Sequence, residues 1–218
     1  VGQNQMHLDS TGIKNRQKSY IGNGMIDDNI REFNEDELSF QEWIQYSQLV
    51  HAHALGLAIR AHRMKAPHCM GTLFWQFNDC WPGPSWSIRD YEGNHKVAYD
   101  VVKKYYQPII GSMEEQNGNI EVGLVSDKRT DQKVEVIFQC FQSEGIDSFT
   151  QTWTDTLNFL NPRNYSLTIP RKYRKRGFSK KNHYYCILTI LQEDKIIFKD
   201  EFFPKENTTV RALTYFSD

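Results

Sequence analysis

The length, composition and charge of this chain restrict the classes of protein to which it can belong. Its 218 residues exceed one small domain but fall short of a complete (β/α)8 barrel, so we expect one or two folded units. The 26 basic residues nearly balance the 27 acidic ones, which argues against nucleic acid or a membrane as a partner. No apolar run approaches the roughly 20 residues that cross a bilayer.

The first half of the chain has the pattern of helices alternating with a buried strand. Asn34 and the acidic residues after it predict the start of a long helix, which apolar residues at helical spacing carry to about Met64. The mostly apolar run 70–77 does not alternate, and it predicts a strand that is buried on both faces. A second helix is predicted over about 96–106. This order is typical of the closing part of an α/β barrel or of an open α/β sheet.

In the second half, the spacing of the apolar residues changes. In the range 108–118 the apolar residues follow no regular spacing, which predicts a linker. Beyond it, Val134, Val136, Phe138 and Cys140 alternate with polar residues, as in a strand with one buried face. Strands are predicted near 120–126, 132–141, 150–159, 164–169, 183–192, 196–203 and 208–216. About seven short strands in about 100 residues are typical of an immunoglobulin-like sandwich.

The four cysteines do not form an obvious disulfide framework. Cys69 and Cys80 lie at the two ends of a predicted extended segment, which places them too far apart for a disulfide. Cys140 and Cys186 fall in two β-segments that could be neighbours. The sequence favours two buried free thiols there over a disulfide, and it leaves the redox compartment open.

The stretch 71–87 combines aromatic side chains with amide and carboxylate groups. It contains Trp75, Trp81 and Trp86, with Asn78 and Asp79 between them. A pyranose offers its C–H face to a flat aromatic ring and its hydroxyls to amides and carboxylates. Parallel barrels carry their active sites at the C-terminal ends of the strands, where this stretch would lie. A sugar site and a plain aromatic plug of the barrel mouth are both compatible with the pattern.

The same stretch closely resembles the β-mannosidases of glycoside hydrolase family 2. Their last barrel strand reads G-T-[LM]-[YF]-W-Q-L-N-D-x-W, and the similarity continues through 88–93 and 96–108. Gln76 and Asp79 favour the β-mannosidases over the exo-β-glucosaminidases, which tend to lack both. The β-galactosidases and β-glucuronidases carry different residues after the tryptophan of the strand. The resemblance is therefore to one branch of the family.

The resemblance implies a fold of mixed class, α/β plus all-β. Residues 1–110 would form the C-terminal part of a TIM-barrel catalytic domain, and residues 111–218 an immunoglobulin-like β-sandwich. The parent enzyme would hydrolyse terminal β-mannosyl residues of oligosaccharides with retention of configuration. Its partner would be an oligosaccharide or glycoside substrate, and neither a metal nor a cofactor is expected.

The resemblance also assigns substrate-binding residues. Trp75 would line the subsite for the terminal sugar, and Asn78, Asp79 and Trp81 would line or brace the same pocket. Retaining hydrolysis needs two carboxyl groups about 5–5.5 Å apart. In the family, both glutamates lie on earlier barrel strands. The glutamates of the first half precede or open a helix, and nothing places them at the C-terminal end of a strand; they are Glu32, Glu35, Glu37 and Glu42. No catalytic residue is therefore assigned, and we expect the chain alone to be inactive.

Two other functions are compatible with the sequence. The parent could be another family 2 exo-glycosidase, either an exo-β-glucosaminidase or a β-galactosidase-like enzyme. Alternatively, the chain could serve as a non-catalytic accessory module. Because the N-terminus resembles an internal cut, the sequence leaves a periplasmic, secreted or lysosomal location of the parent open. Barrel faces that lack their neighbours would be exposed, and we expect the fragment to self-associate through them.

Overall fold

The computed structural model describes residues 11–34, 36–142, 148–170, 173 and 184–203. The chain divides into two compact units. The first contains the described residues up to 58, together with 73–103. The second contains 59–72 and the described residues from 104 onward.

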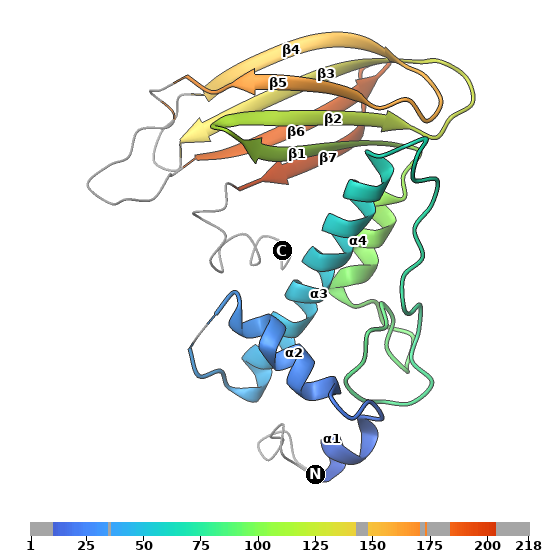
Figure 1. The fold of residues 1–218 in the computed structure, drawn as a ribbon, viewed down its shortest axis with the longest axis vertical. Helices are drawn as coiled ribbons and strands as arrows, with labels where there is room; N and C mark the ends of the chain where they lie inside the picture. Colours follow the sequence, from blue (N-terminus) through green and yellow to red (C-terminus); the bar gives the residue numbers. More distant parts are fainter. Residues whose placement is uncertain (1–10, 35, 143–147, 171–172, 174–183, 204–218) are drawn as a thin grey trace. The chain divides into compact units, whose positions relative to one another are not determined.

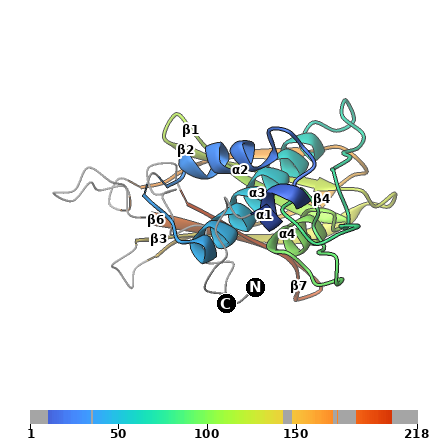
Figure 2. The same cartoon turned by 90° about the horizontal axis from the view of Figure 1, so that it is seen from below.

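The first unit is built from helices. These are α1 (Thr11–Arg16), α2 (Gly22–Arg31) and the greater parts of α3 (Phe40–Arg63) and α4 (Val97–Tyr105). The helices α2 and α3 lie side by side in both views (Figures 1 and 2). Ile30, Trp43 and Val50 form the buried cluster of these two helices, because each lies on the apolar stripe of its helix. The predicted helices over 34–64 and 96–106 correspond to α3 and α4, whereas α1 and α2 were not predicted.

The N-terminus of α3 differs from the predicted one. Ser39 and Glu42 form a capping box, in which the Ser39 hydroxyl accepts from Glu42 N at 3.3 Å and Glu42 Oε2 accepts from Ser39 N at 2.8 Å. The helix therefore begins at Phe40. Asn34 instead accepts a hydrogen bond from Asp36 N at 3.0 Å in a local turn. An asparagine before acidic residues suits both a helix cap and such a turn, so the pattern alone did not separate them.

The predicted buried strand over 70–77 is wrong. No strand is assigned there, Leu73 is fully exposed, and Trp75 is 76% exposed. A strand that is buried on both faces needs strand neighbours and covering helices, and the described residues of the first unit provide no such neighbours. The backbone of Gln76 instead pairs with the loop that follows, accepting from Ile88 N at 3.0 Å and donating to Trp86 O at 2.9 Å.

The second unit contains a sandwich of two antiparallel sheets, stacked in Figure 1. One sheet has the order β1-β2-β5 and the other the order β4-β3-β6-β7. The strands are β1 (Ile109–Gln116), β2 (Asn119–Ser126), β3 (Gln132–Gln142), β4 (Ser148–Leu157), β5 (Arg163–Thr168), β6 (Tyr184–Gln192) and β7 (Lys195–Phe202). The prediction of a sandwich-type all-β portion is confirmed. The predicted strand over 208–216 lies outside the described residues.

The predicted linker over 108–118 is wrong, because most of it forms strand β1. This strand pairs with β2 along its whole length. Asn117 and Gly118 connect the two strands with φ angles of 51° and 79°, which suit a two-residue hairpin turn. The beginning of β1 is buried on both faces and therefore lacks a two-residue period.

The core between the sheets is formed by alternate residues of their strands. Val136 and Phe138 of β3 point inward and are fully buried, as the alternation predicted. Gly111 of β1 faces Leu188 of β6 so closely that a Cβ atom at Gly111 would clash with the leucine side chain. Cys140 and Cys186 are direct cross-strand partners, and both are buried free thiols. A hydrogen bond with Cys140, followed by burial, raises the pKa of the Cys186 thiol.

The end of α3 and the end of α4 contact the sandwich through charged groups. Asp200 on β7 is 2% exposed and accepts hydrogen bonds from Lys104 Nζ at 2.6 Å and from Tyr105 Oη at 2.9 Å. The guanidinium of Arg60 lies 3.6 Å from the second carboxylate oxygen. Burial and the Asp200 charge raise the pKa of Tyr105, so its hydroxyl stays protonated and donates.

Arg63 and Met64 extend these contacts to the other sheet. Arg63 donates to the carbonyl oxygens of Tyr105 at 2.8 Å and of Gln107 at 2.6 Å, and it forms an ion pair with Asp127 at 2.7 Å. Met64 lies against Gly123 on the outer face of β2. Carbonyl groups at the end of α4, which have no partner within the helix, are thus bonded by a side chain from α3. Among the described residues, no helix has the length and apolar composition needed to cross a membrane.

Candidate functional site

The candidate site is the loop between residues 73 and 96 of the first unit, which has little regular secondary structure. Its backbone is ordered by hydrogen bonds between its two arms. Asp79 N donates to Arg89 O at 3.1 Å, and Arg89 N donates to Phe77 O at 3.0 Å. Asp90 closes a turn by accepting from Asn94 N at 2.8 Å. The loop therefore has a defined shape from which side chains can project.

A buried polar cluster lies at the centre of this loop. Asp79 is 7% exposed, and its two carboxylate oxygens are bonded by Ser85 Oγ and, at 3.0 Å, by Lys96 Nζ. Lys96 also donates to Ser87 Oγ at 2.7 Å, and Ser87 is fully buried. A buried carboxylate is stable when it is paired and hydrogen-bonded in this way. Asp79 thus braces the loop, and each of its carboxylate oxygens already accepts a hydrogen bond within it.

The other three predicted binding residues lie at the surface. Trp75 is 76% exposed and Trp81 is 46% exposed. Trp81 Nε1 donates to Arg16 O at 3.0 Å, which fixes the edge of its ring against the C-terminal end of α1. Asn78 is exposed, and its Nδ2 donates to Asp79 O at 3.2 Å. The structure thus brings Asn78 and Asp79 together, and it presents the two indole rings to solvent from the same loop.

Sequence reasoning missed the partners of Asp79. Lys96 follows Asp79 by 17 positions, and Ser85 and Ser87 lie between them. The spacing of these residues corresponds to no helix or strand period, so only the resemblance of the whole stretch could have pointed to them. Arg89 was also missed. It donates to Gly93 O at 2.6 Å and lies over the ring of Phe77.

The charge of Lys96 also affects the pKa of His51, a histidine of α3. Burial, and then the positive charge of Lys96, lower the pKa of His51 to about 4. His51 is therefore neutral at pH 7. Among the described residues, no group of three or more histidine, cysteine or acidic side chains could hold a metal ion.

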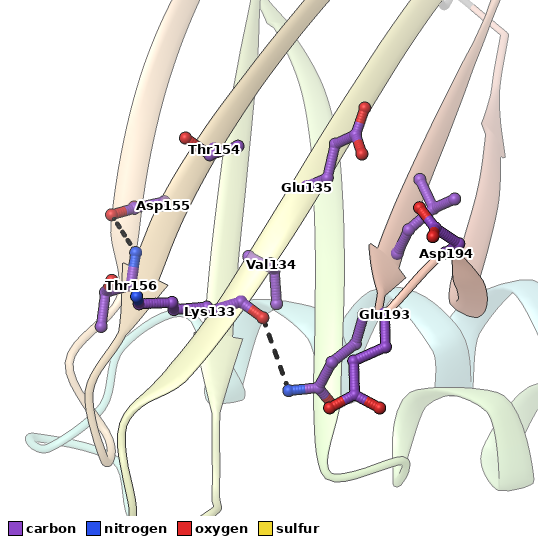
Figure 3. A pocket seen from close by; sticks show the side chains of 10 residues that line it. Lys133, Val134, Glu135, Thr154, Asp155, Thr156, Glu193 and Asp194 are labelled. Atoms are coloured by element: carbon purple, nitrogen blue, oxygen red, sulfur yellow. Dashed lines mark hydrogen bonds between the residues drawn. The ribbon is translucent and has the colours of Figure 1, made fainter.

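Two shallow depressions differ in their chemistry. One, of about 450 Å³, is lined by Trp81 and Tyr91 together with Arg16 and Lys18. The other, of about 560 Å³, lies on the sandwich between β3, β4 and β6 (Figure 3). Although it is larger, its lining holds no aromatic side chain. Aromatic rings are the groups that stack on sugars, so the first depression is the better candidate for contact with a carbohydrate.

The sequence is similar to those of fungal β-mannosidases, although no family model matches the chain. It is 26% identical to β-mannosidase A of Neosartorya fischeri over 152 residues, which is 58% of this chain and 16% of that protein. It is 33% identical to β-mannosidase A of Aspergillus fumigatus over 94 residues, or 41% of this chain and 10% of that protein. Over 72 residues it is 38% identical to β-mannosidase B of Aspergillus niger, covering 32% of this chain and 8% of that protein.

Solved structures agree in fold. A β-D-mannosidase from Dictyoglomus thermophilum matches 88% of this chain and 23% of its own length, with a TM-score of 0.74 and 23% sequence identity. An exo-chitosanase of Amycolatopsis orientalis matches 82% of this chain and 21% of its own, with a TM-score of 0.63 and 15% identity. The sequence relatives are thus β-mannosidases, and the solved structures agree with this chain in fold.

The chain is β-mannosidase-like in sequence, and the predicted resemblance to the β-mannosidases is confirmed. The chain spans only a small part of the relatives that it matches, 16% of the Neosartorya fischeri protein over the aligned residues.

Proposed function

We propose that this chain is part of a retaining exo-glycosidase that hydrolyses terminal β-mannosyl residues of oligosaccharides. In this proposal, residues 1–110 are the C-terminal part of a TIM barrel, and residues 111–218 are an immunoglobulin-like sandwich. The order of α3, loop and α4, followed by two antiparallel sheets, supports this order of domains, with strand β1 of the sandwich beginning at Ile109. The exposed segment 73–77 would then become a barrel strand once neighbouring strands pair with it.

The observation that carries the proposal is the pair of exposed indole rings on a loop that a buried ion pair holds in shape. Trp75 would stack on the apolar face of the terminal sugar, and Asn78 would bond one of its hydroxyls. Trp81, fixed through its Nε1, would flank the same sugar. Asp79 would act indirectly, because Lys96 and Ser85 occupy its carboxylate.

Bond cleavage would be performed by other residues of the parent enzyme. A retaining glycosidase uses one carboxylate as nucleophile and a second carboxyl group as acid and base, about 5–5.5 Å apart. Asp79 is ion-paired and buried, so it cannot fill either role while Lys96 holds it. The chain would contribute one wall of the sugar pocket, and the reaction would need neither metal nor cofactor.

Hydrolysis of an aryl β-mannoside tests the proposal directly. The full-length parent should release the aryl group with retention of configuration, whereas the purified 218-residue chain should release none above a heat-denatured control. A full-length parent that leaves the aryl β-mannoside intact would refute the proposed substrate. Turnover by the pure chain would refute the assignment of catalysis to other residues.

A second candidate is exo-β-glucosaminidase activity. The similarity in fold to the Amycolatopsis orientalis exo-chitosanase favours it, whereas Gln76 and Asp79 favour the mannoside. A panel of aryl β-mannoside, aryl β-glucosaminide and aryl β-galactoside distinguishes the two and includes the β-galactosidase-like alternative. The substrate with the highest kcat/KM identifies the activity, and inactivity on all three would support the accessory-module alternative.

A further inference from the structure

The edge of the four-stranded sheet at β4 is long, and no strand among the described residues pairs with it. Strand β4 pairs with β3 on one side, and no other strand of the described part of the chain pairs with it. The free edge runs from Ser148 to Leu157. Figure 1 shows β4 at the margin of the sandwich. A free strand edge presents unpaired N–H and C=O groups that can bond another strand.

This edge lacks the features that protect the edges at β7 and β5. The edge strand β7 carries Lys195, Lys199 and Glu201 beside a register shift in its pairing with β6. Strand β5 is only six residues long. Strand β4 has ten residues, contains neither proline nor lysine, and pairs with β3 without a register shift. Charges, prolines, bulges and shortness are the usual means of preventing edge pairing.

The charge distribution of β4 makes it complementary to itself. Its outward face carries Thr150, Thr152, Thr154 and Thr156, and the first three of these are exposed. Its one charged residue, Asp155, points inward, where the Tyr165 hydroxyl and Arg163 contact it. A second copy of β4 would therefore meet this edge without placing like charges opposite each other.

The geometry of antiparallel pairing restricts how two copies of β4 can meet. Only every second residue of an edge strand directs its N–H and C=O away from its own sheet. Opposite residues in a β4–β4 pair must therefore both be even-numbered or both be odd-numbered. Every such register sets threonine against threonine, or against Ser148, on the outward face. Cross-strand threonine pairs stabilise antiparallel sheets.

We propose that the free edge of β4 pairs antiparallel with β4 of a second copy of this chain, which joins the two four-stranded sheets into one. The interface is related by a two-fold axis, so each copy uses the same surface. It differs from the exposed apolar residues around Trp75, which lie in the other unit. The occupant is a second copy, because the neutral threonine row complements itself.

Sedimentation of the 218-residue chain over a series of concentrations tests the pairing. The wild-type chain should form a dimer, and the double variant Thr152→Lys/Thr154→Lys should weaken it about tenfold or more, because like charges then face each other. Gln139→Lys is the matched control, since Gln139 lies on the same face but on the central strand β3. It should leave the dimer unchanged.

Cross-linking gives a readout that does not depend on destabilisation. In a background of Cys69→Ser/Cys80→Ser, a cysteine at one of the four threonine positions should form disulfide-linked dimers under mild oxidation, and Gln139→Cys should form none. A wild-type chain that is monomeric at all concentrations would overturn the proposal. So would a dimer that survives the lysine variants but is lost in Leu73→Ser/Trp75→Ser, because that dimer would use the other surface.

Discussion

Replacement of Asp200 by asparagine should destabilise the sandwich strongly. The carboxylate is 2% exposed, and its cationic neighbours are themselves largely covered, with side-chain exposures of 14% for Arg60 and 27% for Lys104. Asparagine keeps the shape of the side chain and an oxygen acceptor for Tyr105. It removes the negative charge that offsets the two cations.

The size of the effect follows from this burial. Removing one partner of a buried ion pair costs about 3–5 kcal/mol, because it leaves the other charge uncompensated. Since asparagine retains hydrogen bonding, we expect Asp200→Asn to cost about 3 kcal/mol, near the lower end of that range. Lys104→Met should cost about 1.5–3 kcal/mol, the value of a hydrogen bond to a charged group. The double variant should cost less than the sum, because Arg60 is then the one remaining cation of the cluster.

Urea unfolding followed by circular dichroism measures these costs. With a slope of about 1–3 kcal/mol per M of urea, a loss of 3 kcal/mol lowers the midpoint by about 1–3 M. Glu201→Gln is the control, because Glu201 lies on the same strand and its ion pair with Lys199 is partly exposed. Exposed pairs contribute about 0–1 kcal/mol. Equal midpoints for Asp200→Asn and Glu201→Gln would show that the buried cluster does not stabilise the unit.

Three further predictions concern single residues. In the parent enzyme, Trp75→Ala should lower kcat/KM about 5- to 150-fold through the loss of about 1–3 kcal/mol of stacking, while Tyr20→Ala, which also removes an exposed ring, should change little. The folded chain should lose up to about 3 kcal/mol of stability between pH 6.5 and 4, because the unfolded state protonates His51 first; His51→Gln should flatten this pH dependence of the urea midpoint. Gly111→Ala should cost about 1–3 kcal/mol in urea unfolding by overpacking the core, whereas Gly24→Ala, on a helix with open space around it, should not destabilise.

The sequence predicted best those elements whose pattern is set by a single buried face. The alternation in β3 places Val136 and Phe138 in the core, as expected. Prediction from the sequence failed where the burial of a segment depends on residues that are distant in the chain. Strand β1 begins with Ile109 and Ile110, which are both buried from opposite sides, so no period marked it. Segment 73–77 has the apolar composition of a buried strand, but the partners that would bury it are not among the described residues.

In the candidate site, too, some features could be predicted from the sequence and others could not. The aromatic and polar composition of the loop identified Trp75, Asn78, Asp79 and Trp81 as candidates, and their role in binding stays a prediction. The bracing of Asp79 by Lys96 depends on a fold of the loop that brings positions 17 residues apart within 3.0 Å. No local pattern encodes such a contact. Composition thus indicated where the chemistry could lie, and tertiary structure identified which carboxylate is already occupied.

The contacts of Arg63 and Met64 connect the last turn of α3 to the proposed sandwich domain. Residues 111–218 form the proposed sandwich domain, but its first sheet is covered by Met64, and the entry to β1 is bonded by Arg63. A gene segment that began at residue 111 would expose Gly123 and the face around Val125, which are buried in the whole chain. Recombination at the domain boundary would therefore yield a sandwich in which this normally covered face of β2 is exposed. Any lineage that exchanges this domain must also supply a substitute for one turn of α3.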